Sequence, residues 1–126
     1  MTTNQTLRLS SHDELYIIDL ERVLFMQADD HYTQITYASG STFMVPFGLA
    51  RIEERIAEME GVRDFLLRLG RKYIVNIKRI FRINTAREML QLSDDHGENL
   101  SIHISKPVLR SLIDMLRAGD GEQESS

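Results

Sequence analysis

Apolar residues occur along this chain mostly in short stretches, three to six residues long, that are separated by polar breaks. Stretches of this length, rich in β-branched and aromatic residues, are typical of β-strands. They cover residues 15–18, 23–26, 32–37, 42–45, 65–67, 73–75, 80–83, 89–92 and 100–104. Two pairs of stretches flank turn-forming sequences, one around Gly40 and one across residues 94–99, so we expect a β-hairpin at each place.

Two further segments repeat their apolar residues at helical spacing. The first has apolar residues at positions 49, 52, 56 and 59, and Gly61 supplies a stop signal after it. The second follows Ser105, an expected N-cap, with Pro107 in its first turn and apolar residues at 108, 109, 112, 113 and 116. The pattern therefore predicts two amphipathic helices whose apolar stripes pack on the core.

Nine short strands and two short helices, without βαβ units, indicate a mainly β fold made of small antiparallel sheets. A chain of 126 residues is long enough for one domain with its own core. We place this domain at residues 13–117. Residues 1–12 are expected to form an N-terminal extension, and residues 118–126 a small, polar, acidic and disordered tail.

Composition excludes several classes of protein. The chain contains no cysteine, which excludes a disulfide scaffold, a thiolate nucleophile and cysteine-based metal centres. No apolar run reaches about 18 residues, so no membrane-spanning helix is predicted. The first six residues lack the basic and apolar regions of a signal peptide. We therefore expect a cytoplasmic protein with no membrane partner.

The net charge of the chain and the distribution of charge along it indicate different binding partners. A net charge of −4 opposes nucleic-acid binding, because affinity for DNA depends largely on neutralising phosphates. One basic segment nevertheless contains a single acid, Asp64, and eight basic residues: Arg63, Arg68, Arg71, Lys72, Lys78, Arg79, Arg82 and Arg87. Two interpretations remain open, a face for a polyanion or a solvated surface on which cations protect sheet edges.

Catalytic chemistry finds little support in the sequence. The four histidines show no i,i+4 pair for zinc, and there is no nucleophile motif or Gly-rich phosphate loop. Asp29, Asp30 and His31 could in principle hold a metal, although adjacent aspartates between strands are typical of a turn. We expect no enzyme, no cofactor and no metal site.

The remaining candidate binding residues lie in the middle of the basic segment. Arg71 and Lys72 follow Gly70 between two apolar strands, where a turn can project cations beyond the sheet. Arginine can pair with guanine O6 and N7 or grip a phosphate, and lysine acts as a mobile charge. Tyr73 could stack on a base or pack in the core. Asn76 could read a base, but bonding to nearby backbone is the expected role.

These residues resemble the LytTR family, the DNA-binding domain of many bacterial response regulators, over about residues 15–116. Residues 25–32, FMQADDHY, match the family's E-A-x-x-x-Y stretch, and residues 47–56 match its short helix. The most specific block, F-x-R-x-H-R-S-y-i-V-N-x-x-x-I, is matched by RLGRKYIVNIKRI at residues 68–80. The closing i-p-v-S-r junction is matched by SIHISK at residues 101–106.

The resemblance implies an elongated assembly of small antiparallel sheets whose loops enter successive major grooves of bent duplex DNA. The contacting loops would carry His31 and Thr33, Arg71 and Lys72, and Lys106. With the neighbouring cations, the expected DNA-binding residues are His31, Thr33, Arg68, Arg71, Lys72, Lys78, Arg79 and Lys106. Tyr73, Val75 and Asn76 are expected to be structural.

Three departures from the family pattern concern base specificity. Gly70 and Lys72 replace the histidine and serine of H-R-S, Gln27 replaces a glutamate, and Lys106 replaces an arginine that could bind bidentately. The family usually follows a receiver domain of a two-component system. We therefore expect a stand-alone protein or one controlled by a separate regulatory protein.

The hypothesis from the sequence is a sequence-specific transcription regulator that binds double-stranded DNA, with a second copy of the chain as a candidate partner in a homodimer on repeated half-sites. The alternative is a LytTR-like protein-interaction module that has lost or weakened DNA binding, which the net charge of −4 and the missing histidine motivate.

Overall fold

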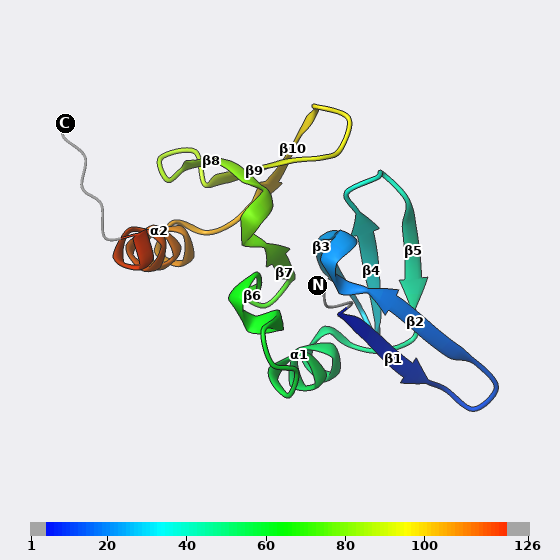
Figure 1. The fold of residues 1–126 in the computed structure, drawn as a ribbon. Coiled ribbons are helices and arrows are strands. Elements are labelled where there is room, and N and C mark those ends of the chain that lie inside the picture. Colours follow the sequence, from blue (N-terminus) through cyan, green and yellow to red (C-terminus); the bar gives the residue numbers. More distant parts are fainter. Residues whose placement is uncertain (1–4, 121–126) are drawn as a thin grey trace.

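The computed structural model describes residues 5–120 and shows a mainly β fold (Figure 1). The strands are β1 (Thr6–Ser10), β2 (Leu15–Asp19), β3 (Val23–Asp29), β4 (Tyr32–Tyr37), β5 (Thr42–Val45), β6 (Leu66–Leu69), β7 (Tyr73–Asn76), β8 (Ile80–Asn84), β9 (Met89–Ser93) and β10 (Asn99–His103). The helices are α1 (Leu49–Ala57) and α2 (Lys106–Asp120), with 3-10 turns η1 (Leu20–Arg22), η2 (Val62–Asp64) and η3 (Ile77–Arg79). The predicted fold class is confirmed.

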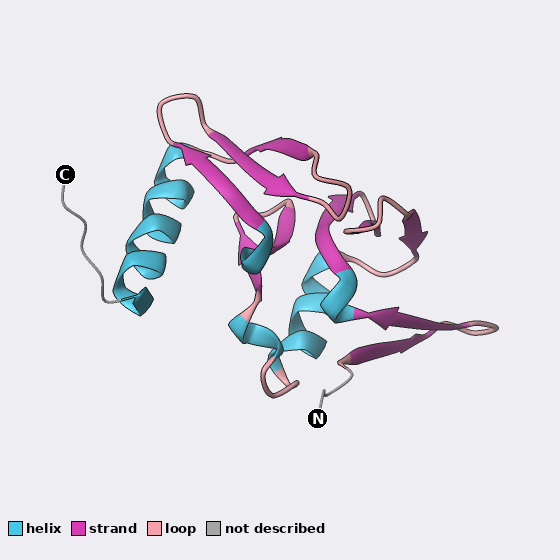
Figure 2. Cartoon of the chain, turned by 45° about the horizontal axis from the view of Figure 1, so that its top comes forward, coloured by secondary structure: helices cyan, strands magenta, loops and turns pink. Residues whose placement is uncertain are grey.

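The strands form three antiparallel sheets. The central sheet has the order β5-β4-β3-β7-β6, a second sheet has the order β10-β9-β8, and β1 pairs with β2 in a separate ribbon. In Figure 2 the β1–β2 ribbon projects on one side of the molecule and α2 stands on the other, which gives an elongated outline. Among the described residues, no helix is long and apolar enough to cross a membrane.

The middle strands of the central sheet, β3 and β7, are buried on both faces, which explains why they contain continuous apolar runs. One face contacts α1 and the β1–β2 ribbon, and the other contacts β9, β10 and α2. Neighbouring residues of β7 divide between the two cores, with Ile74 on the first side and Val75 on the second. A register shift between Val23 and Phe25 in β3 places Leu24 and Phe25 together in the second core.

The structure describes ordered residues beyond both ends of the expected domain. Leu7 and Leu9, in the segment that we expected to be an extension, are fully buried in the first core. At the other end, α2 continues through Asp120, so residues 118–120 are helical rather than disordered. The expectation for residues 1–4 and 121–126 lies outside the described residues.

Candidate nucleic-acid interface

Three segments that are distant in the sequence meet at one end of the central sheet. They are the β3–β4 turn (residues 29–31), the β6–β7 turn (residues 70–72) and the β10–α2 junction (residues 103–106). The Ala28 amide donates to the Lys72 carbonyl at 2.8 Å, and Gln27 pairs with Tyr73, so the first two segments are neighbours. We call these three segments together the turn face.

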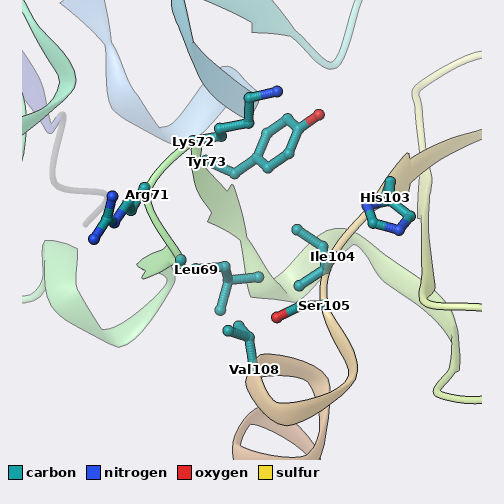
Figure 3. A pocket seen from close by; sticks show the side chains of 9 residues that line it. Leu69, Arg71, Lys72, Tyr73, His103, Ile104, Ser105 and Val108 are labelled. Carbon is teal, nitrogen blue, oxygen red and sulfur yellow. The ribbon is translucent and has the colours of Figure 1, made fainter.

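A shallow hollow of about 190 Å³ separates the β6–β7 turn from the β10–α2 junction. Leu69, Ile104 and Val108 form its apolar floor, and Tyr73 and His103 lie along its side (Figure 3). The side chains of Arg71 and Lys72 leave the turn in different directions. The turn face is therefore an open surface with projecting cations, not an enclosed ligand cavity.

Arg68 holds the β6–β7 turn in shape. Gly70 has φ +68°, a conformation that glycine adopts easily. Arg68 donates from Nε to the Gly70 carbonyl at 3.0 Å and from Nη2 to the Arg71 carbonyl at 3.0 Å. Its Nη1 lies 2.6 Å from Glu53 Oε1 on α1. Arg68 was an expected DNA contact, but its guanidinium is committed to positioning the turn.

The cations that remain on the turn face are exposed. Arg71, Lys72 and Lys106 lie at the surface, and none of them takes part in the ion pairs found within residues 5–120. His31 is also exposed, and its Nε2 lies 3.9 Å from Asp30 Oδ1. The three lysine and arginine side chains come from two of the segments, so they present positive charge on the β6–β7 turn and on the β10–α2 junction.

Acidic residues also lie here. Asp29 and Asp30 are exposed in the β3–β4 turn, and Asp30 has φ +61°. Their negative charge repels a polyanion and therefore offsets part of the attraction of the neighbouring cations.

Glu88 fastens the β10–α2 junction from the β8–β9 turn. Its Oε2 accepts the Lys106 amide at 2.8 Å, and its Oε1 lies 3.1 Å from His103 Nε2. The Lys106 amide and then His103 hold the pKa of this carboxyl below its ordinary value. We expected the Ser105 side chain to cap this helix, but the carboxylate that accepts the first-turn amide comes from Glu88.

Thr33 does not lie on the turn face. Its side chain is fully buried, and its hydroxyl donates to the Phe47 carbonyl at 2.7 Å. The prediction that Thr33 contacts DNA is therefore contradicted, because strand alternation turns it into the core beside Ile35.

Lys78 and Arg79 lie at the opposite end of β7 from the turn face. Four strand residues span roughly 13 Å, which separates the two ends. Lys78 Nζ lies 5.0 Å from the centroid of the Phe65 ring, and Arg79 Nη1 pairs with Asp95 Oδ1 at 2.8 Å. These two expected DNA contacts are not brought together with Arg71 and Lys72.

The three residues expected to be structural lie in or beside the core. Asn76 is buried, donates to the Val23 carbonyl at 2.9 Å and accepts the Lys78 amide at 3.0 Å. Val75 is fully buried. Tyr73 is half-buried, with its ring centroid 6.1 Å from that of Phe25.

No group of three metal-ligating side chains converges within residues 5–120. Asp29, Asp30 and His31 therefore do not form such a group.

The profile of the LytTr DNA-binding domain family matches residues 13–117. The chain belongs to the LytTr DNA-binding domain family. A solved structure from Bacillus cereus, the LytTr DNA-binding domain of a protein described as a methyl-accepting/DNA response regulator, has the same fold. Its TM-score is 0.60 at 21% sequence identity, with 91% of this chain and 98% of that chain covered. No curated protein matches the chain.

Membership of the LytTr family confirms the resemblance drawn from the sequence and makes this chain a DNA-binding domain. The family is defined by DNA binding rather than by an enzymatic reaction. Sequence reasoning overlooked His103, which lies on the turn face, and Glu88, which contacts it from the β8–β9 turn. His103 lay inside the SIHISK junction and could have been noticed there, whereas no local pattern indicates that Glu88 reaches this helix.

Proposed function

We propose that this LytTr domain is a sequence-specific transcription regulator whose turn face enters successive major grooves of duplex DNA. The observation that carries the proposal is the placement of Arg71, Lys72 and Lys106. These three exposed cations come from two of the three adjacent segments and lack partners among the ion pairs of residues 5–120. Cations elsewhere in the predicted set are occupied, as Arg68 is by Glu53 and Arg79 by Asp95.

Each cation of the turn face fits a different part of DNA recognition. Arg71 carries a planar fork that can bind guanine O6 and N7 together. Lys72 and Lys106 are mobile charges suited to phosphates on either side of a groove. Arg68 holds the carbonyls of Gly70 and Arg71, so the backbone that carries Arg71 is already in place before DNA binds.

The proposal is tested by titrating a selected duplex with the domain at several salt concentrations. Affinity should fall steeply and linearly on a log–log plot, and Lys72→Ala should reduce the slope by about 0.9, the value of one lost phosphate contact. Arg71→Ala should cost about 1–3 kcal/mol on the selected duplex and much less on a scrambled duplex. The matched control is Arg63→Ala, an exposed arginine on η2, before the start of β6.

A protein-interaction module that has lost DNA binding is the second candidate. It is favoured by Asp29 and Asp30, which place two carboxylates on the turn face. The absence of binding to any duplex from a random pool at low salt would favour this candidate and contradict the first.

A further inference from the structure

Glu88, which lies outside the turn face, contacts three residues of the β10–α2 junction: His103, Ile104 and Lys106. Besides its carboxylate contacts with His103 and Lys106, Glu88 accepts the Ile104 amide through its own carbonyl at 3.1 Å. Glu88 has φ +53°, a conformation that residues other than glycine seldom adopt. The β8–β9 turn thus keeps an unfavourable backbone conformation at the residue that makes these contacts.

The histidine that Glu88 contacts lies at the open surface of the turn face. Its side chain is 74% exposed and lines the hollow of the turn face together with Lys72 and Tyr73 (Figure 3). Its Nε2 faces the Glu88 carboxylate, which can only accept a hydrogen bond, so Nε2 carries the hydrogen. The other nitrogen, Nδ1, is then an acceptor in the neutral ring and a donor in the protonated ring.

The charges around His103 come from every neighbouring segment. Glu88, from the β8–β9 turn, favours the protonated ring. Lys106, from α2, and Lys72, from the β6–β7 turn, oppose it, whereas the Arg71 side chain points away from His103 (Figure 3). A bound duplex would add phosphates that neutralise these two cations, so a proton on His103 becomes more favourable in the complex than in the free domain.

We propose that His103 is a further DNA-contacting residue of the turn face, and that Glu88 is the positioning residue that orients it. This inference rests on the proposed function. It predicts that binding takes up a proton at His103, so affinity for the duplex declines as pH rises through the range in which histidines titrate.

The test measures duplex affinity by fluorescence anisotropy from about pH 6 to about pH 8. Because His31 also lies on the turn face, all variants carry His31→Gln. In that background affinity should decline several-fold with rising pH across this range. Adding His103→Gln should remove the decline. Adding His12→Gln should leave it unchanged, since His12 is an exposed histidine paired with Asp13 at 2.8 Å in the β1–β2 turn.

Glu88→Gln tests the positioning role separately. Glutamine still offers an oxygen to His103 or to the Lys106 amide, but the charge that favours the protonated ring is lost. The midpoint of the pH profile should therefore move to lower pH. A lower melting temperature with an unchanged midpoint would show that Glu88 is only structural and would overturn its assigned role.

The outcomes separate this inference from the proposed function. If His103→Gln keeps the pH profile of its parent while Arg71→Ala loses affinity, His103 is not a contact and the proposed function stands. If the domain binds no duplex at any pH, the proposed function fails first. A lost pH profile in His103→Gln, with the circular dichroism spectrum of the parent, supports the inference.

Discussion

Arg68 Nη1 lies 2.6 Å from Glu53 Oε1, and this ion pair connects α1 to the turn that carries Arg71. The same guanidinium holds two carbonyls of that turn, so one side chain makes three directed contacts. Arg68 therefore holds the β6–β7 turn that carries Arg71 in its shape.

Arg68→Lys should weaken both stability and DNA binding, although it preserves the charge. An ammonium cannot reproduce the planar fork, so we expect a loss of about 1–3 kcal/mol in urea unfolding. Duplex affinity should fall at low salt, with the salt slope unchanged because no phosphate contact is lost. Arg63→Lys is the control. A reduced salt slope in Arg68→Lys would instead assign Arg68 to a phosphate.

Thr33→Val should destabilise the domain and leave DNA binding intact. The substitution keeps the shape but leaves the buried Phe47 carbonyl without its donor, at a cost of about 1–3 kcal/mol. Urea unfolding measures the stability, and anisotropy measures the affinity for duplex DNA. Altered base preference in the folded variant would restore Thr33 as a DNA contact.

Asp30→Asn should strengthen DNA binding. Removing an exposed carboxylate from the turn face lowers repulsion of phosphates, with an expected gain of roughly twofold to fivefold at low salt. Asparagine also tolerates the φ of +61° at this position. Asp13→Asn, in the β1–β2 turn, is the matched control. Equal affinities for the wild type and Asp30→Asn would mean that the β3–β4 turn stays away from DNA.

Asp94→Asn should flatten the loss of stability in acid. The amides of Glu98 and His96 donate to Asp94 Oδ1 at 2.9 and 2.8 Å and hold the pKa of this carboxyl below its ordinary value. Its stabilising contribution is therefore present above the unfolded-state pKa, about 3.9, and is lost as pH falls through the lower folded-state pKa. Melting temperatures from about pH 6 to about pH 2 should show a smaller decline in the variant. Parallel curves would contradict the prediction.

Leu9→Ala should destabilise the domain by about 2–5 kcal/mol, since it opens a cavity in the first core. The matched control is Leu15→Ala on β2, where the side chain is 56% exposed and little should change. Thermal and urea unfolding provide the measurement. Equal stability of the two variants would show that β1 is dispensable.

Local patterns explain which elements were predictable from sequence. The hairpin of β4 and β5 matches its predicted residues 32–37 and 42–45, because strand alternation and the turn at Gly40 are both local signals. β1 has the same signal in Leu7 and Leu9, but its five residues were too few to be separated from an extension. The alternation that buries Ile35 also buries Thr33, which the resemblance alone had placed at DNA.

The candidate site was predictable only where its residues act through their own segment. The β6–β7 turn with Arg71 and Lys72 followed from Gly70 between two apolar strands. The contacts of Arg68 with Glu53 and of Glu88 with Lys106 join distant parts of the chain. The periodicity of the sequence does not encode such pairings. Cations that form ion pairs therefore could not be distinguished in the sequence from cations that stay exposed.

The placement of the turn face on a sheet shared by both cores has a consequence for folding. The β6–β7 turn is anchored through pairing of β3 with β7, a contact between segments far apart in the chain that must wait for loop closure. Packing on either side of the sheet supports that pairing, so neither half should melt alone. The amount of DNA that the domain binds then depends on the folded population. A core substitution remote from the cations lowers the amount of bound DNA in proportion to the fraction of molecules that it unfolds.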